Sequence, residues 1–173
     1  VLGVAAATLI YALVLPVDHR RRFRALNSEI VRDLQGLAAA KDLPAARRWR
    51  AQAYHRVLRL VLRAAPADVS PETVVDGGLA AVTVGTGLLR LRWLLREEQP
   101  PAGVQETIGT ALAALERLGE EPAQAEAAAW EAARQLGAPA GPSAGREGAR
   151  QALIEIAAAL ASNPAFFQGH GRR

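Results

Sequence analysis

Apolar residues recur every three or four positions along most of this chain, and proline or glycine interrupts the pattern at intervals. That spacing places apolar side chains on one face of an α-helix. The composition agrees, because the chain is rich in alanine and only 5% of its residues are aromatic. The 173 residues also suit one compact domain. The sequence therefore predicts an all-α antiparallel bundle of about six or seven helices.

Proline and glycine divide the chain after its first fifteen residues into six predicted helices. Their expected ranges are 17–40, 44–65, 71–98, 104–118, 122–136 and 145–161. The clearest start is at residue 70, where we expect Ser70 to be the N-cap, with Pro71 at the first helical position and Glu72 in the first turn. The segment 138–143 is expected to be a flexible hinge, and 163–173 a short tail.

The first fifteen residues carry no charge and stop at Pro16, just before a basic cluster of Arg20, Arg21, Arg22 and Arg24. A membrane span needs about 20 apolar residues, so this run fits the end of a truncated transmembrane helix. The chain contains no methionine, which predicts a processed product or a piece of a longer protein. Arginines that follow a span mark the cytoplasmic side and interact with anionic lipid headgroups.

A core helix of a soluble bundle is an alternative interpretation of the same run, and it stays open. A signal peptide fits poorly, because its basic residues would come before the apolar run. We therefore expect residues 1–16 to end a transmembrane helix, 17–162 to form a cytoplasmic helical domain and 163–173 to form the tail.

Small residues recur along the longest predicted helix. Gly77, Ala81 and Gly85 follow one another at intervals of four, and Gly78 lies beside them. Glycine inside a helix costs about 1 kcal/mol relative to alanine, so a packing reason is expected. Such spacing also marks membrane helix pairs, but charged residues bracket only a short stretch here. We expect this strip of small residues to allow close contact between two helices of a bundle. Assembly of protomers through the strip is a second expected role.

Charge is divided unevenly between the two parts of the chain. Residues 1–63 hold twelve Lys and Arg against four Asp and Glu, whereas residues 64–173 hold nine against thirteen. The basic part could bind nucleic acid or anionic lipid, or it could dock on the acidic part. Nucleic acid is not favoured, because the aromatic residues fall mostly on apolar helical faces. The arginines between residues 47 and 63 are expected to form a solvated helix face.

The sequence shows no pattern of a catalytic or cofactor site. His19, His55 and His170 are scattered, so no two of them share one helical face at metal-ligand spacing. The two GxG matches lack a preceding strand and a third glycine, and the serines lack a nucleophile motif. We therefore expect a protein that is not an enzyme and has no metal or cofactor.

Several segments, in order along the chain, resemble the fusaric acid resistance and aromatic acid exporter family. The apolar run followed by DHRRRFRAL at 18–26 resembles the last span and exit of these proteins. YHRVLRL at 54–60, GLAA at 78–81 and LLRLR at 88–92 resemble the family's cytoplasmic region, and PAFF at 164–167 resembles its closing segment.

The resemblance implies the C-terminal cytoplasmic region of a bacterial inner-membrane efflux protein, proton-driven and exporting aromatic acids. It implies no substrate-binding residue in this chain. Homo-oligomers and a periplasmic adaptor are candidate partners of such proteins. A soluble helical adaptor or regulator is the alternative function, with the basic part of the chain binding an acidic protein or nucleic acid.

Overall fold

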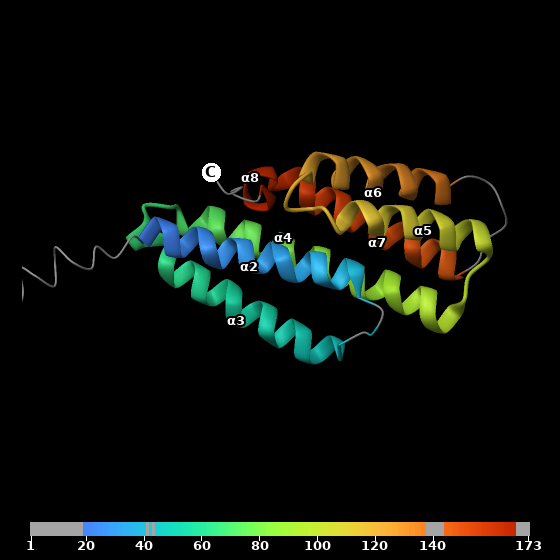
Figure 1. The fold of residues 1–173 in the computed structure, drawn as a ribbon, viewed down its shortest axis with the longest axis horizontal. Coiled ribbons are helices and arrows are strands. Elements are labelled where there is room, and N and C mark those ends of the chain that lie inside the picture. The colour runs from blue at the N-terminus through green and yellow to red at the C-terminus, as the bar shows by residue number, and fades with distance from the viewer. Residues whose placement is uncertain (1–18, 41, 43, 138–143, 169–173) are drawn as a thin grey trace, which may run out of the picture.

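The computed structural model of the protein describes residues 19–40, 42, 44–137 and 144–168 (Figure 1). The predicted membrane segment 1–16, the hinge 138–143 and the end of the tail lie outside the described residues. The α-helices are α2 (His19–Ala39), α3 (Ala46–Ala64), α4 (Pro71–Trp93), α5 (Ala102–Leu115), α6 (Pro122–Leu136), α7 (Ala144–Ser162) and α8 (Pro164–Phe167). The described residues include no strand, and the predicted all-α helical bundle is confirmed.

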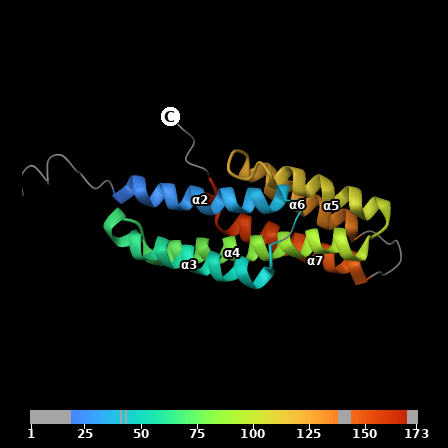
Figure 2. The same cartoon turned by 60° about the horizontal axis from the view of Figure 1, so that its bottom comes forward.

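The long helices lie side by side, and successive ones run in opposite directions (Figure 1). The central helix is α4, which contacts α2, α3, α7 and α8. The view in Figure 2 shows α2 and α3 along the first part of α4, and α5 and α6 toward its other end. Helix α7 packs along α4 from Asp76 to Gly87. The start of α2, the end of α3 and the start of α4 therefore meet at one end of the bundle.

The core is a single apolar cluster to which every long helix contributes. Leu34, Leu88, Leu112, Ile156 and Phe167 are almost completely buried within it. Burial of a side chain of this size stabilises the fold by about 1.5–3 kcal/mol relative to leaving it exposed. Because these residues come from five different helices, the cluster fixes how the helices pack.

The start of α4 differs from the expected capping pattern in one respect. Ser70 occupies the N-cap position, but its side chain makes no capping hydrogen bond. Its carbonyl oxygen accepts the N–H of Val74 instead. Pro71 and Glu72 are placed as expected, so the proline's fixed φ and the first-turn carboxylate favour this helix start.

The end of the long helix is less regular than the sequence pattern predicts. The α-helix stops at Trp93 and widens to a π-helix over Leu94–Glu98. Gln99 then has a positive φ of 42°. Pro100 and Pro101 follow and lack the N–H that would continue the helix.

The predicted tail also contains a helix, because α8 packs against α4, α6 and α7 and buries Phe167.

Candidate membrane-facing end and packing strip

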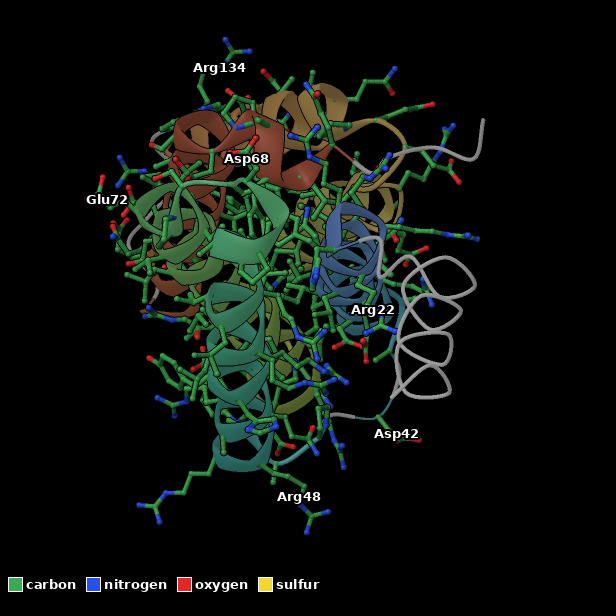
Figure 3. The ribbon with its side chains drawn as sticks, turned by 90° about the vertical axis from the view of Figure 1, so that its left-hand side faces the viewer. Arg22, Asp42, Arg48, Asp68, Glu72 and Arg134 are labelled. Atoms are coloured by element: carbon green, nitrogen blue, oxygen red, sulfur yellow. The ribbon has the colours of Figure 1, made fainter. Side chains whose placement is uncertain are left out.

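The basic cluster occupies the first turns of α2. Arg20, Arg21, Arg22 and Arg24 are all exposed, and Figure 3 shows Arg22 among the side chains of the bundle end. Arg20 Nη2 donates to Asp68 Oδ2 at 2.7 Å, which ties α2 to the turn between α3 and α4. Both partners are solvent-exposed, so the pair contributes little stability.

These arginines lie at the end of α2 where the helix dipole disfavours positive charge, although Arg24 Nε donates to the carbonyl oxygen of Arg20 at 3.4 Å. The N-terminus of a helix carries a partial positive charge, and basic residues there are unfavourable. The first turn of α2 contains no acidic residue. A concentration of exposed guanidinium groups at this end is therefore suited to an external anion, such as a phosphate group.

The small residues of α4 lie against side chains of this same chain. A Cβ added to Gly85 would meet the indole ring of Trp49, and one added to Gly78 would meet Val57. Both neighbours belong to α3, which therefore approaches α4 closely. Ala81 is 2% exposed and lines a cavity of about 10 Å³ beside Trp49. That volume holds one water molecule at most.

Gly77 faces a different neighbour from the rest of the strip. A Cβ at this position would overlap the ring of Phe166 in α8. Gly87, which the four-residue spacing does not include, packs against Ile156 of α7. The glycines of α4 thus admit three other helices, and the sequence spacing pointed to only one shared strip.

Two polar side chains, one buried and one partly buried, were missed by sequence reasoning, because nothing in their local pattern distinguishes them. Asn27 Nδ2 donates to the carbonyl oxygen of Phe166 at 2.8 Å and so joins α2 to α8. Arg92 Nη2 lies 3.6 Å from Glu116 Oε1. Burial lowers the pKa of Arg92, and the nearby carboxylate of Glu116 opposes that change.

The described residues do not gather the groups that catalysis or metal binding would need. They include no cluster of three or more His, Cys, Asp or Glu side chains able to hold a metal ion. His19 and His55 are exposed on α2 and α3, and His170 lies outside the described residues. The absence of enzymatic activity stays a prediction.

One helix in the described part of the chain is long and apolar enough to cross a membrane by length and composition. It covers Pro71–Glu98, with a mean hydropathy of 1.4 over its best window. However, 67% of that window is buried inside the bundle. A central core helix has the same character, and its neighbours α2, α3 and α7 already cover α4 here.

Comparison of the sequence with models of protein families gives a match. The model of the fusaric acid resistance protein family matches residues 1–167. The chain belongs to this family. Fusaric acid resistance proteins are membrane-associated and have a role in membrane transport. A search of curated proteins and a search of solved structures gave no match.

Membership accounts for the order of the segments quoted above, since the match includes both the uncharged opening and α8. It assigns no catalytic, cofactor-binding or substrate-binding residue to this chain. The exposed arginines of α2 and the glycines of α4 therefore stay candidate site residues.

Proposed function

We propose that this chain is the non-catalytic cytoplasmic helical region of a bacterial inner-membrane transporter that exports aromatic acids or related toxic compounds. The family match over residues 1–167 carries the proposal. In this proposal residues 1–15 end a transmembrane helix, and the bundle that starts with α2 stands on the cytoplasmic side. The bundle would act through helix packing, without binding a cofactor.

The charge at the start of α2 supports this orientation. Four exposed arginines lie within eight residues of Pro16. Basic residues this close to a span resist translocation and favour the cytoplasmic side. Beside an anionic bilayer, each would also contribute about 1 kcal/mol of attraction.

Membrane fractionation tests the location. We expect the full chain expressed in a Gram-negative bacterium to sediment with the inner membrane and to resist extraction by high salt. The chain that begins at Val17 should be recovered in the soluble fraction. Recovery of the full chain in the soluble fraction would contradict the proposal and favour the adaptor function.

A charge variant tests the orientation. In the full chain, replacement of Arg20, Arg21, Arg22 and Arg24 by alanine should leave the chain in the membrane. It should also raise the fraction of molecules whose bundle reaches the periplasm, as measured with a membrane-impermeant thiol reagent and a Gln52→Cys label site on the exposed side of α3. The parent chain, which has no cysteine, is the blank. An unchanged orientation would show that these arginines do not determine which side of the membrane the bundle occupies.

A further inference from the structure

The outer side of α3 carries a row of exposed apolar side chains. Tyr54, Leu58 and Leu62 recur at intervals of four and are 53%, 56% and 68% exposed. Residues at this spacing share one side of a helix. The opposite side of α3 already packs in the core through Trp49 and Leu60. The packing of the described helices therefore leaves this row exposed.

The row continues onto α4. Val57 faces Gly78 across the antiparallel pair of α3 and α4. Leu58 and Leu79 each follow one member of that pair by one residue, and in antiparallel helices such residues lie on the same flank. Leu79 is 50% exposed. We define Tyr54, Leu58, Leu62, Val75 and Leu79 as the α3/α4 apolar face, all of them exposed.

The other flank of the two helices is closed. There α2 packs on both α3 and α4. Arg56 of α3 forms ion pairs with Glu29 and Asp33 of α2. The α3/α4 apolar face lies on the side away from α2, and α6 lies across the bundle from α3 (Figure 1).

Arginines border the α3/α4 apolar face. Helix α3 contains six arginines and no acidic residue. Arg59 and Arg63 follow Leu58 and Leu62 by one residue, so they form a parallel row beside the leucines. Apart from Arg56, the arginines of α3 have no carboxylate within ion-pair distance in the described part of the chain: Arg47, Arg48, Arg50, Arg59 and Arg63.

Carboxylates lie at the other edge of the α3/α4 apolar face, where Asp76 of α4 and Glu155 of α7 line one groove with Leu79, and neither is paired with an arginine of α3 in the described part of the chain. Asp76 therefore stands at the α4 edge of the face, whereas the arginines stand at the α3 edge. The arginine row also starts beside the basic cluster of α2, because Arg20 reaches Asp68 just after the end of α3. Exposed arginines are thus present both at the start of α2 and along α3.

A second copy of this chain is a poor occupant of the face. Two copies related by a twofold axis would place the same patch on both sides of the interface. Where α3 of one copy meets α3 of the other, the unpaired arginines of the two copies face each other, and like charges repel. Nucleic acid is also a poor fit, because Tyr54 is the one aromatic residue of the face and stacking platforms need several.

We propose that the α3/α4 apolar face lies on the surface of an anionic lipid bilayer, so that the bundle rests along the membrane. A helix with leucines on one side and arginines beside them binds at the boundary between headgroups and acyl chains. The arginines extend to lipid phosphates while their aliphatic parts cover apolar surface. This inference rests on the membrane location proposed above.

A single fluorescent label tests the contact. The chain has no cysteine, so Leu58→Cys in the full chain gives a unique site for an environment-sensitive fluorophore. We expect its emission to shift to the blue with vesicles of phosphatidylcholine and phosphatidylglycerol, and to change little with phosphatidylcholine alone. The matched control is Ala127→Cys on the exposed side of α6, whose label should stay in water.

A charge reversal tests the role of the arginines. With the label at position 58, Arg59→Glu should raise the lipid concentration for the half-maximal shift by about fivefold or more. Arg32→Glu makes the same charge change at an exposed site of α2 and should have a smaller effect. Circular dichroism confirms that both variants fold. Equal effects of the two reversals would overturn the specific role of α3.

The remaining outcomes separate the alternatives. If the chain floats with anionic vesicles but the label at position 58 stays in water, the face proposal fails and the membrane location stands. If the chain floats neither with the anionic vesicles nor with those of phosphatidylcholine alone, the proposed function fails too. An equal shift with soluble polyglutamate and no lipid would assign the face to an acidic protein. A shift that grows with protein concentration alone would assign it to a second copy.

Discussion

At the scale of single residues, the glycines show which features follow from the sequence. An interval of four along α4 is visible in the chain and places Gly77, Ala81 and Gly85 near one another. The partners are not visible, because Trp49 and Phe166 reach the glycines from elements that are distant in sequence. Gly36 and Gly109 look similar in the sequence, yet no atom lies within 4 Å of a Cβ added to either.

This difference predicts opposite effects of the same substitution. Gly85→Ala should lower the free energy of unfolding by about 1–3 kcal/mol, because the new methyl group displaces the buried ring of Trp49. Gly109→Ala should raise it by up to about 1 kcal/mol, because alanine favours the helix and the position has open space. Urea unfolding measures both. Changes of the same sign would show that α3 and α4 are not in close contact.

At the scale of elements, the boundaries of most helices were predictable and the short ones were not. Proline at the first position of α6 and its apolar periodicity gave the range that the structure has, 122–136. The π-helix Leu94–Glu98 and α8 have no comparable local signal. Helix α8 has only four residues, so its place depends on Phe167 in the core and on the hydrogen bond from Asn27.

Loss of that hydrogen bond should release α8 before it affects the rest of the bundle. Asn27→Ala removes the donor to the Phe166 carbonyl, which costs about 1 kcal/mol. We expect the amide of Gln168 to exchange with solvent about fivefold faster, as measured by NMR. Gln35→Ala is the control, because Gln35 donates from α2 to the Glu116 carbonyl at the end of α5. If both variants change the amide exchange rate of Gln168 equally, the hydrogen bond from Asn27 does not specifically stabilise α8.

At the scale of the whole molecule, the charge division does not explain how the two parts pack. Arg20 and Asp68 form an ion pair across that division, but both are exposed. The contacts of α2 and α3 with α4 bury apolar side chains instead, including Val31, Leu60 and Val84. Five of the arginines on α3 are left without a carboxylate partner in the described part of the chain. The basic surplus is therefore available to an external anionic surface.

The proposed membrane location of residues 1–15 predicts that the chain folds without its uncharged opening. The buried hydrophobic residues of the described core run from Ile30 to Phe167. A chain that begins at Val17 should keep its helical circular dichroism and a cooperative thermal transition, with stability within about 1 kcal/mol of the full chain. Loss of the cooperative transition would mean that residues 1–16 contribute to the core, as the soluble alternative requires.

The sequence by itself determined the helical class, most helix boundaries and the family, because periodicity, proline and glycine act locally along the chain. It also placed the basic cluster directly after an uncharged run. Only the tertiary structure decided which glycines admit a neighbour, that most of α4 is enclosed by other helices, and that Tyr54, Leu58 and Leu62 stay outside the core. These outcomes depend on contacts between segments far apart in the chain, and a local sequence pattern does not specify which distant segment packs against which helix face.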